Sequence, residues 1–192
     1  KVKTADHSLV APVITPANLQ RILRARKFNQ EEALELAEAT VLWRLEERPD
    51  LLRATKDLEK ECCTGKARLG QSFDRHGRPI LLLDSAAENT KDADSQISHL
   101  TWQMMRLARK MESSPNDDIE KNVVFINLER FSLWSAPSMT NTKKTIAILS
   151  KYFCERLGHG ICWQPPFYFS VFLRSVKPFV DPVTYGKVVI IK

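Results

Sequence analysis

The chain has 192 residues, of which 43% are hydrophobic and 27% are charged, and its formal net charge is +6 at pH 7. These proportions are ordinary for a globular protein and exclude a fibrous or largely disordered one. The longest apolar runs, Pro79 to Leu83 and Val188 to Ile191, are far shorter than the roughly 20 residues that cross a bilayer, so no transmembrane helix is expected.

Four cysteines, two of them adjacent at Cys62 and Cys63, offer neither a disulfide framework nor the paired CxxC spacing of a zinc site. We therefore expect a cytoplasmic protein. Lysines and arginines are spread along the chain without a polybasic block. The net charge would suit nucleic acid or an anionic membrane and cannot choose between them, but this distribution favours a solvated basic surface over either.

The first third of the chain carries signals for two helices. Thr15 followed by Pro16 is typical of a helix start, because the hydroxyl can cap the helix and proline is tolerated at the first helical position. Asn29 and Glu32 form a capping-box-like pair that opens a second helix, which Pro49 ends or interrupts. Apolar residues recur at helical spacing in both segments, at Leu19, Ile22, Leu23, Ala33, Leu36, Ala37, Val41 and Trp43.

The pattern changes after Gly65. Arg68 to Phe73, the turn Asp74 to Gly77 and the apolar run Pro79 to Leu83 together predict a β-hairpin. Apolar residues that share one helical face then predict a helix over Ser95 to Met111, packed on a sheet.

The remaining elements alternate between strands and helices. We expect a buried strand at Val123 to Leu128, a helix around Thr142 to Cys154, a strand at Gly160 to Trp163, a helix at Phe167 to Val176 and a strand at Val188 to Ile191. Strands that alternate with amphipathic helices imply parallel crossovers. The predicted fold class is therefore α/β, with a helical N-terminal lead-in over residues 1–64 and a mostly parallel sheet flanked by helices over residues 65–192.

Enzymatic chemistry finds little support in the sequence. His159 lies between Cys154 and Cys162, but Cys162 falls in a predicted buried strand, where a free cysteine is usually an inert small hydrophobe. No Gly-rich phosphate loop occurs, and the four histidines lack metal-binding spacing. We expect no catalytic residue, no metal and no cofactor.

Three segments taken together resemble the CRAL-TRIO lipid-binding family, in particular its yeast-type phosphatidylinositol-transfer branch. The first is Leu23 to Asn29 followed by Trp43-Arg44, and the second is Asp74 to Pro79. The third and most specific runs from Glu155-Arg156-Leu157-Gly158 through Pro166-Phe167 to the segment Val176 to Thr184 and Lys187. The resemblance implies that the sheet forms the floor of an apolar cavity for one lipid, and that the domain over residues 65–192 is incomplete at its C-terminal end.

Within that resemblance, five residues match headgroup-binding positions of the family. Lysine and threonine side chains can hold a phosphate, carboxylates can accept hydrogen bonds from inositol hydroxyls, and an arginine can balance their charge. The resemblance therefore assigns Lys187 and Thr184 to the phosphate. It assigns Glu155, Asp74 and Arg26 to the inositol ring.

The aromatic segment that begins at Phe167 is expected to gate the cavity. A helix that is apolar on most of its surface is either buried core or a mobile lid. The pattern favours a core position for Phe167, whereas the resemblance suggests that Phe172 and its apolar neighbours face the cavity or a membrane. The expected cavity or gate residues are Phe167, Phe169, Phe172 and Phe179.

The expected function is binding of one phospholipid, phosphatidylinositol, and its transfer or presentation between membranes by a monomer that contacts membranes transiently. Val124 and Asn122 stand where family members that exchange choline lipids carry hydroxyl residues, which disfavours choline lipids as ligands. Two alternatives stay open. One is a non-transferring lipid-sensing or protein-interaction module of a larger signalling protein, and the other is a carrier of a neutral hydrophobic ligand, which would not need Lys187.

Overall fold

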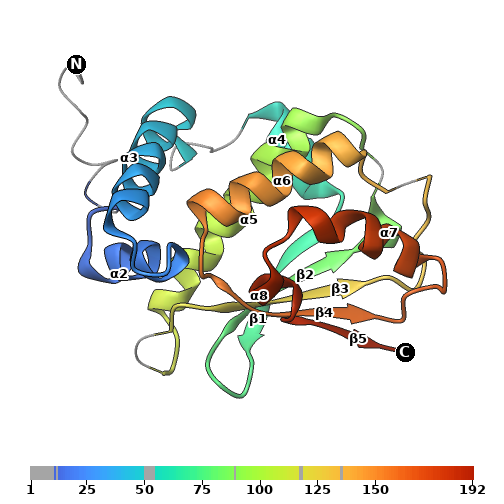
Figure 1. Ribbon diagram of the computed structural model, residues 1–192. Coiled ribbons are helices and arrows are strands. Elements are labelled where there is room, and N and C mark those ends of the chain that lie inside the picture. Colours follow the sequence, from blue (N-terminus) through green and yellow to red (C-terminus); the bar gives the residue numbers. More distant parts are fainter. Residues whose placement is uncertain (1–10, 12, 50–54, 89, 117–118, 135) are drawn as a thin grey trace.

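The computed structural model describes residues 11, 13–49, 55–88, 90–116, 119–134 and 136–192 (Figure 1). Its helices are α2 (Pro16–Ala25), α3 (Gln30–Glu47), α4 (Lys56–Cys63), α5 (Ala93–Glu112), α6 (Met139–Tyr152), α7 (Phe169–Val176) and α8 (Pro182–Tyr185). Its strands are β1 (Ala67–Phe73), β2 (Pro79–Asp84), β3 (Asn122–Asn127), β4 (Leu157–Trp163) and β5 (Val188–Ile191). Two short 3-10 helices follow β2 and α7, namely η2 (Ser85–Ala87) and η3 (Lys177–Phe179).

The two predicted N-terminal helices begin at their predicted caps. The Thr15 hydroxyl accepts a hydrogen bond from the backbone N–H three residues later at 3.3 Å, at the start of α2. Asn29 caps α3, because its Oδ1 accepts from the Glu32 backbone N–H at 3.3 Å while its Nδ2 donates to the Glu32 carboxylate at 2.9 Å. Helix α3 ends at Glu47, two residues before Pro49, as the proline predicts.

Helix α4 was not predicted. It has only eight residues, and a carboxylate occupies a position on its buried face. Glu61 is only 2% exposed and pairs with the Lys66 ammonium at 2.5 Å, while Lys66 also contacts Glu88 at 2.9 Å. Because a buried ion pair replaces an apolar residue, the helical periodicity that would mark α4 is missing from the sequence.

The strands form one sheet in the order β1-β2-β3-β4-β5. Strands β1 and β2 are antiparallel, and the pairs β2–β3, β3–β4 and β4–β5 are parallel. The predicted hairpin, the parallel crossovers and the α/β class are thus confirmed. Strand β4 begins at Leu157 rather than at Gly160, because Gly158 and Gly160 lack the side chains whose alternation would reveal a strand.

Helices α5, α6 and α7 cover one face of the sheet (Figure 1). Leu107 of α5 packs in one apolar cluster with Leu81 of β2, and both are almost fully buried. In a second cluster Phe169 of α7 packs with Cys162 of β4. The strand register places Leu81 and Cys162 on the same face, since successive side chains of a strand alternate between faces.

The opposite face of the sheet is also apolar, but its side chains are less buried. The rings of Phe125 and Trp163 stack there at 6.3 Å between centroids. The apolar residues of this face that are half-buried or exposed are Ile80, Leu82, Phe125, Ile161, Trp163, Val189 and Ile191.

Helices α2 and α3 dock on the connection between α6 and β4. Ile22, Ala33 and Leu36 form one buried cluster with Cys154. The division of the chain after residue 64 stays a prediction, and residues 1–10, 12 and 50–54 of the predicted lead-in lie outside the described residues. None of the helices in the described part of the chain combines the length and hydropathy that a bilayer-spanning segment requires.

Candidate functional site

Four of the five predicted headgroup residues lie near the amino ends of the parallel strands. Asp74 lies in the turn that precedes β2, Glu155 lies two residues before β4, and Lys187 directly precedes β5. Thr184 lies in α8, and its carbonyl accepts a hydrogen bond from the Lys187 N–H at 3.1 Å. Because β2 to β5 are parallel, their amino ends share one edge of the sheet.

Arg26, the fifth predicted residue, follows α2. Its position relative to Glu155 can be judged from Cys154, because the charges of both residues act on the Cys154 thiol. The Arg26 Nη1 donates to the neighbouring Ala25 carbonyl at 3.3 Å. Burial raises the pKa of the Cys154 thiol, and the charges of Arg21 and Arg26 act on that thiol in the opposite direction. Since Cys154 directly precedes Glu155, the fold brings Arg26 to the same region as the predicted carboxylate.

Glu155 has a strained backbone. Its φ of 57° lies in the left-handed region, which costs a residue with a side chain about 1–2 kcal/mol. The conformation is held next to a sheet hydrogen bond, in which the Asn122 N–H donates to the Arg156 carbonyl at 2.8 Å. The Glu155 carboxylate itself has no hydrogen bond or ion pair among the described residues, so a ligand could use it.

Asp74, by contrast, is already paired with Arg78. One carboxylate oxygen contacts the Arg78 guanidinium at 2.7 Å, and the other accepts from the backbone N–H groups of His76 and Arg78, each at 2.9 Å. Burial alone would raise the pKa of Asp74, but these hydrogen bonds outweigh it and hold the pKa below its usual range. Asp74 therefore acts on its surroundings through Arg78.

Arg78 lies beside the predicted headgroup residues, although the sequence interpretation did not single it out. Its Nη1 lies 2.8 Å from the point where a Cβ on Gly158 would sit, so the guanidinium covers the start of β4. The signal was present in the spacing, because Arg78 follows Asp74 by four residues across a tight turn. This spacing brings the Asp74 and Arg78 side chains together only when the turn reverses the direction of the chain.

Lys187 and Thr184 flank an open part of β4. The Gly160 N–H donates to the Lys187 carbonyl at 3.0 Å. A Cβ on Gly160 would meet only one atom within 4 Å, the Val188 Cγ2 at 3.8 Å. Gly160 faces the side of the sheet that α7 covers, so its missing side chain leaves space there. Among the described residues, neither the Lys187 ammonium nor the Thr184 hydroxyl has a hydrogen-bond partner.

Phe167 and Phe169, both expected to line the cavity or gate, lie in opposite environments. The prediction that Phe167 is a core residue is wrong, since its side chain is 90% exposed. Helix α7 begins only at Phe169, whose N–H donates to the Pro166 carbonyl at 2.9 Å in a turn that carries Phe167 outward. Phe169 is the buried residue, and its ring meets that of Phe131 edge-on at 5.3 Å.

The other two predicted gate residues, Phe172 and Phe179, are neither fully buried nor fully exposed. The Phe172 ring lies 5.7 Å from that of Phe131 and is half-buried. Phe179 of η3 is 43% exposed, and the Lys143 ammonium of α6 lies 4.3 Å from its ring centre. This cation–π contact joins the end of the gate segment to α6.

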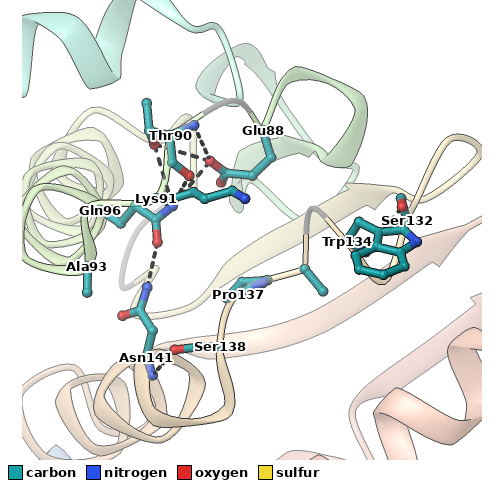
Figure 2. Close-up of a pocket in the computed structure, with 11 residues that line it drawn as sticks. Glu88, Thr90, Lys91, Ala93, Gln96, Ser132, Trp134, Pro137, Ser138 and Asn141 are labelled. Carbon is teal, nitrogen blue, oxygen red and sulfur yellow. Dashed lines mark hydrogen bonds between the residues drawn. The ribbon is translucent and has the colours of Figure 1, made fainter.

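A cavity of about 530 Å³ lies beyond the carboxyl ends of β2 and β3, near the starts of α5 and α6. Figure 2 shows Gln96 and Asn141 pointing toward each other in its wall, with the Asn141 amide donating to the Gln96 carbonyl at 2.5 Å. Trp134 lies at its rim and is 92% exposed. None of the predicted headgroup or gate residues lines this cavity.

The buried cysteines are poor nucleophiles. Burial raises the pKa of Cys162 to about 11, so the reactive thiolate is scarce at neutral pH. His159, the only histidine between Cys154 and Cys162 in sequence, is exposed. In the part of the chain that the structure describes, no group of three or more His, Cys, Asp or Glu residues is placed to hold a metal ion.

Comparison with known proteins finds relatives over most of the chain. The model of the CRAL/TRIO domain matches residues 64–192. A CRAL-TRIO domain-containing protein of Schizosaccharomyces pombe is 30% identical over 174 residues, which are 91% of this chain and 17% of that protein. The SEC14 cytosolic factor of Eremothecium gossypii is 27% identical over 188 residues, which are 91% of this chain and 61% of that protein.

Two further likenesses concern a named transfer protein and a solved structure. The phosphatidylinositol transfer protein PDR17 of Saccharomyces cerevisiae is 27% identical over 182 residues, which are 88% of this chain and 50% of that protein. The chain thus spans less than two thirds of the length of each of these three relatives. The crystal structure of Sfh5 matches with a TM-score of 0.75 at 17% identity, over 99% of this chain and 69% of that one, which shows a shared fold.

Proposed function

Because the chain belongs to the CRAL/TRIO domain family, we propose that it binds one phospholipid, phosphatidylinositol, and transfers or presents it between membranes. The lipid lies on the face of the sheet that α7 covers, with its headgroup toward the amino ends of β4 and β5. The proposal assigns the protein no covalent chemistry and no cofactor. The name of one relative, phosphatidylinositol transfer protein PDR17, supports this ligand and its transfer.

The observation that carries the proposal is a group of unpaired polar side chains around an open part of β4. The Glu155 carboxylate, the Thr184 hydroxyl and the Lys187 ammonium have no hydrogen-bond partner among the described residues. Half-buried charged groups are costly unless they are paired. A bound headgroup supplies those partners, and the space beside Gly160 gives the lipid room.

The chemistry of the headgroup fits these groups one by one. Lys187 and Thr184 donate hydrogen bonds to the phosphate, and Glu155 accepts them from ring hydroxyls. Arg26 balances the charge of Glu155. Asp74 contributes by fixing Arg78, whose guanidinium then faces the same edge of the sheet.

Exposed apolar side chains give the protein a means of brief contact with a membrane. Phe167 and Val171 are 90% and 65% exposed at the start of α7. The loop after β3 adds Leu133 and Trp134, and the Tyr168 hydroxyl, which donates to the Phe131 carbonyl at 2.6 Å, holds that loop against α7. We propose that a cytoplasmic monomer uses these side chains to touch the bilayer while the lipid is exchanged.

Mass spectrometry of lipids extracted from the purified protein tests the ligand directly. We expect phosphatidylinositol in the extract. Recovery of only a sterol or another neutral lipid would refute the headgroup assignment and favour a carrier of a neutral ligand.

A vesicle-to-vesicle transfer assay tests the site. Lys187→Ala is expected to lower phosphatidylinositol transfer at least tenfold, since it removes a charged hydrogen bond to the phosphate worth about 1.5–3 kcal/mol. Lys144→Ala, which removes a half-exposed lysine of α6, is the matched control and should leave transfer unchanged. Equal transfer by the two variants would contradict the assignment, and binding without transfer by the unaltered protein would identify a lipid-sensing module.

A further inference from the structure

A second cavity, of about 390 Å³, lies between α2, α3, α5 and the connection from α6 to β4. None of the five predicted headgroup residues lines it. Its apolar wall includes Ile22, Met105 and Phe153, and Glu112 is the carboxylate among its lining residues. The cationic side chains that line it are Arg21, Arg44, Arg109, Lys151 and Arg156.

Arg21 is the deepest of these cations. Its side chain is only 8% exposed, and its Nε has no hydrogen-bond partner among the described residues. A buried charge costs several kcal/mol unless it is paired. The carboxylate whose charge acts on Arg21, that of Glu120, is itself paired with the Arg24 guanidinium. Among the described residues, Arg21 therefore has no ion pair with a carboxylate and keeps an unsatisfied Nε inside the cavity.

Arg156 adds a second, half-buried guanidinium to the lining of this cavity. Its Nη1 donates to the Glu120 carbonyl at 3.2 Å and lies 3.3 Å from the Met111 sulfur, both of them uncharged acceptors. Burial, followed by the charge of Arg21, lowers the pKa of Arg156 to about 10. The charge of Arg21 thus acts unfavourably on Arg156, in a cavity whose described lining includes five cationic side chains and one carboxylate.

We propose that this cavity is an anion site for a phosphate group, carried either by a soluble phosphate ester or by a lipid headgroup, and separate from the inositol-lipid site. Guanidinium groups bind phosphate through paired N–H···O bonds, so one phosphate can satisfy Arg21 and relieve its repulsion with Arg156. A volume of about 390 Å³ exceeds that of a single phosphate and falls in the range of small-molecule sites. The remaining room, lined by Tyr152 and Phe153, would accept the organic part of the ligand.

Calorimetric titration of the full chain with inorganic pyrophosphate tests the proposal. We expect one bound pyrophosphate per chain at low ionic strength. Arg21→Met should weaken binding at least tenfold. Arg109→Met, which removes an exposed cation of the lining and poses little risk to folding, should weaken it about threefold. Arg174→Met on α7 lowers the net charge equally but lies outside the cavity, so it should leave binding unchanged.

Two further experiments distinguish a lipid headgroup from a soluble phosphate ester, and the proposed anion site from the inositol-lipid site. Phosphatidylcholine vesicles that contain phosphatidic acid will displace pyrophosphate if the natural ligand is a lipid headgroup, and will leave it bound if the ligand is a soluble phosphate ester. Lys187→Ala should leave pyrophosphate binding intact even where it abolishes inositol-lipid transfer. Absence of pyrophosphate binding, or an equal loss in the Arg21, Arg109 and Arg174 variants, would overturn the proposal.

Discussion

Replacing Glu155 by glycine should make the protein more stable and less able to transfer lipid. The φ of 57° at Glu155 costs about 1–2 kcal/mol for a residue with a Cβ. Glycine avoids that cost, although its greater freedom in the unfolded chain offsets about 0.5–1 kcal/mol of the gain. The net stabilisation is about 0–1.5 kcal/mol, or a rise in Tm of up to about 6 °C for a chain of this size.

Gln164→Gly is the matched control for this experiment. Gln164 has a φ of 46°, is exposed and lies just after β4, at the end away from Glu155. Its N–H donates to the Ile191 carbonyl at 2.7 Å, and glycine retains that bond. Both variants should therefore gain stability in thermal unfolding, but only Glu155→Gly should lose phosphatidylinositol transfer, by about tenfold. If Glu155→Gly is less stable than the unaltered protein, or transfers lipid normally, the view that Glu155 keeps a strained backbone for its ligand is refuted.

Three other substitutions test contacts described above. Asp74→Asn should lower the free energy of unfolding at neutral pH, and this loss should shrink below about pH 4. The reason is that the pKa of Asp74 is lower in the folded protein than in the unfolded chain, where it is about 3.9. The stability that Asp74 contributes is therefore present above the unfolded pKa and is lost as the pH falls through the folded pKa. A deficit that stays constant from neutral pH to pH ~3 in urea titrations would contradict this. Lys66→Met should cost about 3–5 kcal/mol in the same titrations, because it leaves the buried Glu61 carboxylate without its ammonium partner; a cost below about 1 kcal/mol would show that the pair adds little. Phe169→Ala should lower the free energy of unfolding by about 3–5 kcal/mol, because its ring is buried. Phe167→Ser should leave thermal unfolding almost unchanged but reduce vesicle binding, because its ring is exposed. A larger loss of stability in Phe167→Ser than in Phe169→Ala would contradict these positions.

Much of the fold could be predicted because its signals are local. The caps at Thr15 and Asn29 lie beside the helices that they start, and the turn at Asp74 lies between the strands that it joins. Helix α4 escaped prediction because Glu61 is buried by pairing with Lys66, a fact that no periodic pattern records. The position of Phe167 was predicted wrongly because the turn after Pro166 delays the start of α7 by two residues.

The candidate sites were less accessible to sequence reasoning because they depend on contacts between distant segments. The resemblance to a family assigned Glu155, Thr184 and Lys187, but only the strand order shows that Glu155 and Lys187 lie at one edge of the sheet. No sequence pattern predicted the second cavity, which we propose as an anion site. Arg21 and Arg156 lie far apart in the sequence, and only the fold brings them into the lining of one cavity.

The lining of the second cavity, which we propose as an anion site, is shared between the predicted lead-in and the α/β part of the chain. Arg21 and Arg44 come from α2 and α3, whereas Arg109 and Arg156 come from α5 and the α6–β4 connection. A boundary drawn at residue 64, where the family match begins, would cut through this cavity. A ligand bound there contacts both parts at once, so it would stabilise only the chain in which they are docked. The N-terminal helices would then behave as part of one cooperative folding unit, whose docking is controlled by the concentration of the anion.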